Sequence, residues 1–342
     1  MTWNLRLLII ILTATSSSVF AQIGGTTIFN SLNIQPSARI AAMGGSFIAA
    51  KDGDVNIAGA NPSAMDSTMH RRLSFSYVDY FTNTNFGHAA YAHQIKKDLT
   101  VGATMQFISH GEMTEYDPLG NELGAFKAGE FGLTLGAAYQ YDSLWSLGAN
   151  LKTFYSSISY FNSLAFAADF AATYHRPDKN FTISGVIKNL GYQVKSFTSD
   201  SREKLPFEMQ VGITKRPRHA PFRFSLMFDN IQKWDLTYIN SNEASVIDPI
   251  TGQIVQQKNF VFGDKLMRHI TLGTEFLLGE SFQLRAAYNY RRRVELATND
   301  RPGMSGFSFG IGFRVKKIDL SYGRAIYSLA GPSNHFTFGF RI

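Results

Sequence analysis

Large apolar residues occupy every second position at the end of the chain. Residues 335–342 read His-Phe-Thr-Phe-Gly-Phe-Arg-Ile. A period of two separates the side chains of a strand onto its two faces. Three phenylalanines on one face need a large apolar environment, which lipid around a closed barrel provides. We therefore predict that one set faces lipid and the other faces inward: Phe336, Phe338, Phe340 and Ile342 against Thr337, Gly339 and Arg341.

The same alternation recurs upstream and predicts a series of strands. Fourteen segments show it, and their apolar faces begin at Leu73, Phe86, Leu99, Phe131, Trp145, Leu164, Phe181, Phe207, Phe222, Ile270, Phe282, Phe307, Ile318 and Phe336. The opposite faces carry small and polar residues such as Ser146, Asn150 and Lys152. This pattern predicts apolar faces toward lipid and a polar lumen.

The lengths of the connections favour a barrel over a sandwich. Connections after even-numbered segments are short, whereas most after odd-numbered ones are long: 109–129, 189–205, 230–265 and 291–305, with 82–85 as the exception. Long loops at one end and tight turns at the other are typical of up-and-down outer-membrane barrels. The fold class predicted is an all-β transmembrane antiparallel barrel of about fourteen strands, spanning residues 71–342.

The first seventy residues differ from the rest. Residues 1–21 have the charge, apolar core and small-residue end of a secretory signal peptide. Residues 22–70 contain a small-residue run, 37–46, that predicts one short helix ending at Gly44-Gly45. A segment with so few large apolar groups does not support its own core. We expect it to form a plug-like segment in or against the lumen.

Composition agrees with an exported barrel. Charged residues make up only 17%, and the chain has 29 Phe, 15 Tyr and 29 Gly. There is no Cys, which excludes a disulfide framework and a lipoprotein anchor. The net charge of +7 is spread through turns, which argues against nucleic-acid binding. These features place the protein in the outer membrane of a Gram-negative bacterium.

Several short patterns resemble chemical motifs without their context. Gly306–Gly310 matches a nucleophile elbow, but the alternation continues through it and makes Ser308 a strand residue. Residues 52–56 resemble the start of a calcium loop that lacks the later glycine and glutamate. His88 and His93 are five apart and face opposite sides. We predict no catalytic, cofactor-binding or metal-binding residue and no enzymatic activity.

Two basic clusters remain. Arg291-Arg292-Arg293 opens a long outer loop and is either a solvated stretch or a site for lipopolysaccharide phosphate, since guanidinium groups suit phosphate. Residues 215–219, Lys-Arg-Pro-Arg-His, are interpreted as a periplasmic turn.

The segment 38–45, followed by Asp52 and by 61–65 (Asn-Pro-Ser-Ala-Met), resembles the N-terminal signature of the FadL-like barrels. This resemblance implies a fourteen-stranded outer-membrane barrel with an N-terminal segment in its lumen. It also implies one function, a channel for small hydrophobic molecules. A soluble surface β-protein is the reading that the resemblance disfavours.

A closer resemblance, carried by 24–33, 73–80, 205–212 and 220–225, is to a barrel component of the type IX secretion system. It implies a non-enzymatic role in anchoring partners of a cell-surface attachment complex, among them PorZ, PorU and PorV. The long outer loops 109–129, 230–265 and 291–305 are the expected contact sites. The loop 230–265 is rich in apolar residues and is either a partner site or a cap over the barrel mouth.

Overall fold

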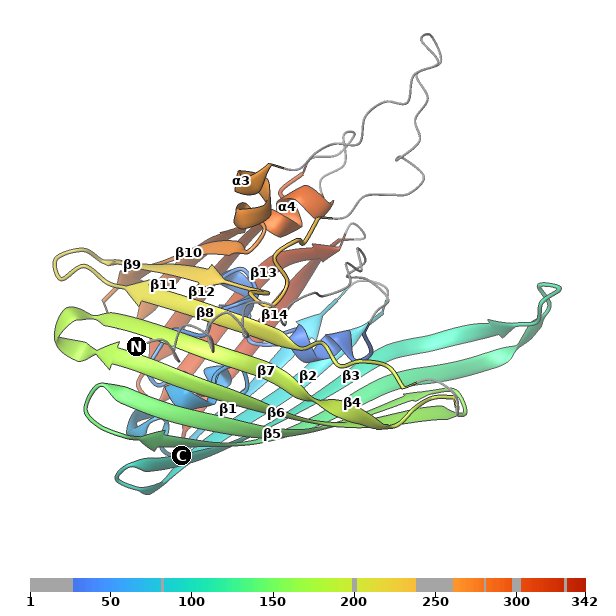
Figure 1. Cartoon of the computed structure of the whole chain (residues 1–342), viewed down its shortest axis with the longest axis horizontal. Coiled ribbons are helices and arrows are strands. Elements are labelled where there is room, and N and C mark those ends of the chain that lie inside the picture. Colours follow the sequence, from blue (N-terminus) through green and yellow to red (C-terminus); the bar gives the residue numbers. More distant parts are fainter. Residues whose placement is uncertain are drawn as a thin grey trace, which may run out of the picture.

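The computed structural model describes residues 27–80, 83–198, 202–237, 261–279, 281–296, 303–328 and 331–342. The expected signal peptide, residues 1–21, lies outside them. Fourteen antiparallel strands form one closed barrel in which sequence neighbours pair and β14 returns to β1 (Figure 1). The strands are β1 (Arg72–Asp79), β2 (Asn85–Lys96), β3 (Leu99–Tyr116), β4 (Glu122–Gln140), β5 (Trp145–Ile158), β6 (Phe161–Arg176), β7 (Phe181–Lys195), β8 (Glu208–Lys215), β9 (Phe222–Phe228), β10 (Ile270–Leu278), β11 (Phe282–Asn289), β12 (Phe307–Val315), β13 (Ile318–Ser328) and β14 (Gly331–Arg341).

The predicted strand number and the up-and-down order are confirmed, but two predicted long loops contain strand: β7 continues to Lys195, inside the predicted loop 189–205, and the predicted loop 109–129 is wrong. The stretch 109–129 is mostly strand: β3 and β4 continue as a paired ribbon beyond the barrel wall, with Glu112–Tyr116 opposite Lys127–Glu122. The ladder shifts register between Ser109 and Glu112, and Gly111 there has a φ of 75°. The ribbon projects far past the other strands (Figure 1).

The two faces of β14 differ in exposure as the alternation predicts. Phe336 and Phe338 are 49% and 41% exposed on the outer surface, whereas Thr337 between them is 9% exposed. Gly339 is buried, but Arg341 is exposed rather than enclosed, because it stands at the end of the strand where the barrel opens. Outward-facing aromatic and aliphatic side chains on the other strands continue this surface, as a lipid-facing belt requires.

Lysine in place of Phe338 should destabilise the barrel by about 2–4 kcal/mol, the cost of a cation on the lipid face near the bilayer midplane. Reversible unfolding by urea in lipid vesicles measures this cost. Ile342→Lys is the matched control, because Ile342 lies one residue beyond β14 and is 61% exposed. There the cost should be about 0–1 kcal/mol. Equal effects of the two substitutions would contradict the orientation of β14.

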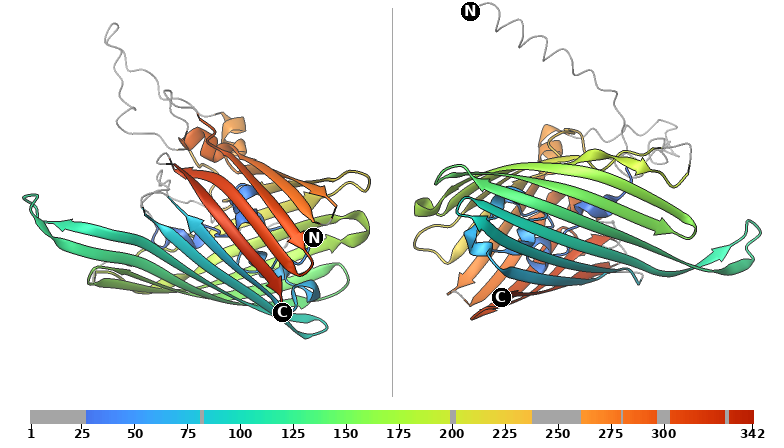
Figure 2. Two further views of the ribbon diagram at one scale, coloured as in Figure 1. Left: turned by 180° about the vertical axis from the view of Figure 1, so that it is seen from behind. Right: turned by 90° about the horizontal axis from the view of Figure 1, so that it is seen from below.

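Residues 27–70, here called the inner segment, lie inside the ring of strands (Figure 2). They form one short helix, α2 (Ala38–Ala42), and four 3₁₀ turns: η1 (Asn30–Asn33), η2 (Val55–Ile57), η3 (Pro62–Ala64) and η4 (Ser67–Met69). The helix begins and ends where the sequence predicts, since Ser37 is its N-cap and the glycines after it have φ of 90° and 81°. Only glycine adopts such angles without strain.

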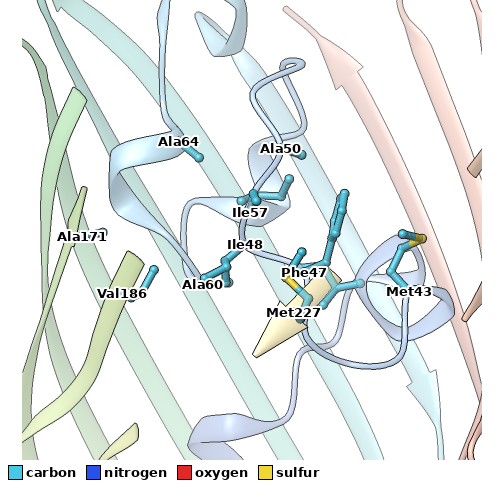
Figure 3. Packing of buried hydrophobic residues seen from close by; sticks show 12 residues of the cluster. Met43, Phe47, Ile48, Ala50, Ile57, Ala60, Ala64, Ala171, Val186 and Met227 are labelled. Carbon is cyan, nitrogen blue, oxygen red and sulfur yellow. The ribbon is translucent and has the colours of Figure 1, made fainter. Parts of the chain in front are cut away.

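The inner segment forms its core together with the barrel wall. Its buried apolar residues, among them Phe47 and Ile57, belong to one cluster with wall residues Ala171, Val186 and Met227 (Figure 3). Small wall residues let the segment approach closely. The lumen is therefore lined by polar and small wall residues but filled by protein.

The outer connections contain two short α-helices. The stretch 291–305, expected to be a loop, begins as the helix α4 (Tyr290–Leu296), and α3 (Phe262–Met267) precedes β10. A 3₁₀ turn, η5 (Pro177–Lys179), links β6 and β7. Most of the loop 230–265 lies outside the described residues. Within the described ranges, no helix is long and apolar enough to cross a membrane.

Candidate functional site

A buried ion network ties the inner segment to the barrel. Arg39 of α2 contacts Glu275 of β10 (Nε–Oε1, 2.9 Å) and two carboxylates of its own segment, Asp52 (Nη2–Oδ2, 2.7 Å) and Asp54 (Nη1–Oδ2, 3.2 Å). Arg223 of β9 bridges Asp52 and Glu275 from the wall, at 2.5 and 2.9 Å. Glu275 is 0% exposed, and a carboxylate buried in this way needs cations beside it, which Arg39, Arg223 and Arg285 supply.

The network explains residues 52–56 without calcium. Burial alone would raise the pKa of Asp52, but the guanidinium groups of Arg39 and Arg223 hold that pKa well below its ordinary value. Asp54 accepts hydrogen bonds from the backbone and side-chain nitrogens of Asn56 and so caps η2. These carboxylates are already committed to arginines and to a helical cap.

A second buried ion pair lies close to the point where the ladder between β7 and β8 ends. Lys152 of β5 lies 2.7 Å from Asp169 of β6 and donates to the side chain of Asn189 in β7. Asn189 has a φ of 57°, and its backbone nitrogen donates to Asp169. The ladder between β7 and β8 ends just before it, at the pair Lys188–Glu208.

Beyond that point the inner segment itself contributes to the wall. Thr27 forms a parallel bridge with Lys204, and the backbone nitrogen of Ile28 donates to the Lys204 carbonyl at 3.0 Å. The outer part of β7, Leu190–Lys195, pairs with β6 but has no ladder with β8. This interruption, here called the β7–β8 seam, leaves the outer part of β7 without a ladder on the side that faces β8.

A cavity of about 590 Å³ opens at the outer mouth, between the start of the inner segment and the ends of β1 to β5. Apolar side chains contribute much of its lining: Ile28, Phe29, Ile34, Phe86, Ile108 and Ile158. Polar residues also line it, among them His110, Glu203 and Ser31, whose hydroxyl donates to the carboxylate of Glu130. Apolar walls with placed polar groups are typical of small-molecule sites.

The residues of the motif-like patterns, Ser308, His88 and His93, lie in strands of the barrel wall. Ser308 is buried inside β12, which continues through Val315 as a strand. His88 and His93 do not meet. Instead, His93 lies against His70, with ring centroids 4.6 Å apart. Within the described ranges, no group of three metal-ligating side chains occurs.

The two basic clusters, Arg291–Arg293 and residues 215–219, make contacts that the sequence did not predict. Arg292 turns inward and stacks on the Tyr327 ring at 4.1 Å, and Arg291 lies 3.8 Å from Glu295 within α4. Lipopolysaccharide binding at this triplet stays a prediction. Arg216, interpreted only as part of a turn, lines a second cavity at the opposite end of the barrel. Sequence reasoning missed this residue because its charge resembles that of any solvated turn.

No family model matches the chain, and no curated protein matches it. Similar solved structures include the toluene transporter TodX of Pseudomonas putida, at 11% identity, covering 90% of this chain and 96% of that one with a TM-score of 0.54. The deltaS2 mutant of the TodX monoaromatic hydrocarbon channel gives 11% identity, coverage of 89% and 96% and a TM-score of 0.52. A FadL homologue of Pseudomonas aeruginosa gives 12% identity, coverage of 90% and 96% and a TM-score of 0.42. The first two show that the chain has the fold of these outer-membrane barrels.

Proposed function

We propose that this outer-membrane barrel is a channel of the FadL type that receives small hydrophobic molecules at its outer mouth. The observation that carries the proposal is the outer cavity, whose volume of about 590 Å³ suits a molecule the size of a substituted aromatic hydrocarbon. The similar structures are described as transporting toluene and monoaromatic hydrocarbons, which supports this class of ligand.

In this proposal the inner segment is a plug. It lies between the outer cavity and the opposite end of the barrel, so a bound molecule must leave either by displacing the segment or by passing through the wall. The β7–β8 seam is the natural exit through the wall, because strand pairing is already interrupted there between Asn189 and Lys204. Transfer through the wall would deliver an apolar molecule directly to lipid.

Substituting Ile158 with Asp should weaken binding of a fluorescent hydrophobic probe, N-phenyl-1-naphthylamine, at least tenfold. The change removes apolar lining and puts a charged carboxylate where an apolar probe would bind. Probe fluorescence with purified barrel in detergent measures affinity, and toluene should displace the probe. Tyr160→Asp is the matched control, because Tyr160 is 90% exposed two residues along the chain and does not line the cavity. Equal loss in both variants, or no saturable probe binding, would contradict the channel.

A second candidate function is suggested by the ribbon of β3 and β4. The sequence resemblance is to PorQ of the type IX secretion system, and it suggests an anchor for PorZ, PorU and PorV at the cell surface. The ribbon presents Tyr116, Leu119 and Leu123 at 60%, 87% and 63% exposure. The ladders to β2 and β5 stop at Ser109 of β3 and Ala128 of β4, and beyond a hydrogen bond from Ser159 to the Lys127 carbonyl (3.3 Å) neither outer edge of the ribbon is paired among the described residues. Free edges and exposed apolar groups suit a partner that adds a strand.

Deleting residues 112–127 should separate the two candidates. An anchor should stay folded in the membrane and lose its partner in a pull-down from mild detergent. A channel should keep probe binding, since none of the deleted residues lines the outer cavity. Leu119→Asp tests the same surface without shortening the chain, and retention of every co-purifying protein in both variants would exclude the ribbon as an anchor.

A further inference from the structure

The second cavity lies at the end of the barrel where the connections are short. Its volume is about 400 Å³, and its walls are the ends of β9 to β14, the start of β1 and the inner segment around α2. Short turns face the periplasm in outer-membrane barrels. The cavity is therefore open to the periplasm and lies on the far side of the inner segment from the outer mouth.

Positive charge exceeds negative charge around this cavity. Six arginines line it against three aspartates, and Glu275, which contacts three of the six, makes a fourth carboxylate, so two positive charges remain. The arginines are Arg39, Arg72, Arg216, Arg223, Arg285 and Arg314. A charge surplus in a low-dielectric lumen is costly unless an anion neutralises it.

The surplus is concentrated near the mouth. Asp319 is shared by Arg72 and Arg314, whose guanidinium groups each contact it through one nitrogen. Within the described residues, no side chain pairs with the Arg216 guanidinium, which lines the cavity from the turn between β8 and β9. Several N–H donors of Arg216 and Arg314 therefore remain for a ligand, and guanidinium forks match carboxylate and phosphate oxygens.

Two further donors line the cavity. The hydroxyl groups of Ser37 and Ser74 are buried and have no hydrogen-bond partner among the described residues. Buried hydroxyl groups without partners are uncommon in native proteins and indicate a missing hydrogen-bond partner, and a serine hydroxyl can donate to an anion. In β12, Gly312 leaves room for a guanidinium group, because a Cβ there would lie 2.8 Å from Nη1 of Arg285.

From the charge surplus, the unpaired donors and the enclosed volume, we infer that this cavity is a binding site for a small multivalent oxyanion entering from the periplasm. Its ligand carries phosphate or carboxylate groups and fits within about 400 Å³. Arg216 and Arg314 hold the anion at the mouth, where the surplus charge lies, whereas Arg39, Arg223 and Arg285 are balanced by Asp52, Asp54 and Glu275. The inference does not depend on what the outer mouth binds.

Calorimetric titration of the full barrel in neutral detergent at low ionic strength tests the site, with pyrophosphate and citrate as separate probes. Saturable binding of one molecule is expected. Tighter binding of pyrophosphate would assign a phosphate ligand, and tighter binding of citrate a carboxylate ligand. The double variant Arg216→Gln/Arg314→Gln should weaken binding at least tenfold. If this variant fails to fold, judged by its heat-dependent gel mobility, Arg216→Gln alone should still weaken binding severalfold.

Arg218→Gln is the matched control, because Arg218 belongs to the same turn but is exposed and does not line the cavity. Its affinity for either probe should equal that of the unmodified barrel. Equal weakening by Arg218→Gln would show general attraction to a basic surface and overturn the site. Absence of saturable binding for both probes would overturn it as well.

Discussion

Replacing Arg39 with methionine should release the inner segment from the wall while the barrel stays closed. Arg39 is the cation through which α2 reaches Glu275 of β10, and both side chains are almost completely buried. Removing one partner of a buried, hydrogen-bonded pair typically costs about 3–5 kcal/mol. Since about 1.4 kcal/mol is a tenfold change in an equilibrium, amide exchange of the inner segment should accelerate at least a hundredfold.

Hydrogen exchange followed by mass spectrometry measures the release, with peptides from 38–66 compared with peptides from the strands. Arg39→Lys should accelerate exchange of the inner segment less than Arg39→Met does. Its ammonium group keeps the charge but cannot contact two carboxylates as a planar guanidinium group does. Arg324→Met is the control, since Arg324 is an exposed arginine on β13. Unchanged protection of α2 in the methionine variant would show that apolar packing alone holds the segment.

The strands could be predicted from the sequence because their signal is local. A strand with lipid on one face and the lumen on the other must alternate apolar and polar residues. The strands at Phe307–Val315 and Phe336–Ile342 can therefore be predicted without knowledge of their neighbours. The ribbon of β3 and β4 has no such signal. Both of its faces are exposed to water. Because neither face is buried, its sequence does not have to alternate apolar and polar residues.

The ion network could not be predicted because its partners are far apart in the sequence. Arg39 and Glu275 are 236 residues apart, and nothing near either residue indicates the other. One signal was available. Glu275 is a lone carboxylate inside the apolar strand 270–278, and a charge on such a strand implies a buried cation nearby. That reasoning predicts a partner but cannot choose among the chain's arginines.

The outer cavity shows a similar limit. The FadL-like resemblance implies a luminal N-terminal segment, but the cavity forms only where Ile28 and Ile34 of that segment meet Phe86 and Ile108 of the wall. Each of these residues is an ordinary apolar residue in its own stretch of sequence. Their shared role depends on how the segment docks, which the pattern of single residues does not contain.

Valine in place of Gly148 of β5 should displace the turn of the inner segment that packs against this strand. A Cβ at Gly148 would lie 2.3 Å from the backbone nitrogen of Ser63 and 2.5 Å from the carbonyl carbon of Pro62. Real Cβ atoms do not approach so closely, and backbone cannot turn aside as a side chain can. The turn would therefore lose the hydrogen bonds from Ser146 to the Ser63 carbonyl (2.7 Å) and between the Ser63 and Thr173 hydroxyls (2.7 Å).

Leaving these buried groups unpaired should cost about 3 kcal/mol or more, at about 1–3 kcal/mol for each group. The matched control is Gly185→Val in β7, where nothing lies within 4 Å of an added Cβ. Hydrogen exchange in peptides covering 57–65 should be faster in the Gly148→Val variant and unchanged in the Gly185→Val variant. Retained protection in the Gly148 variant would mean that β5 itself moves aside, and the close contact between segment and wall would then not be required.

Combining Gly148→Val with Arg39→Met tests whether the inner segment leaves the wall as one unit. The two residues hold different parts of it, the turn at η3 and the helix α2, on different strands. If the segment moves as one body, either single substitution should raise hydrogen exchange in both parts. The double variant should then lose less stability than the sum of the two single losses. If the halves dock independently, each change should affect only its own half and the two costs should add. A channel that opens by displacing its plug requires the first result, whereas exit through the β7–β8 seam is compatible with the second.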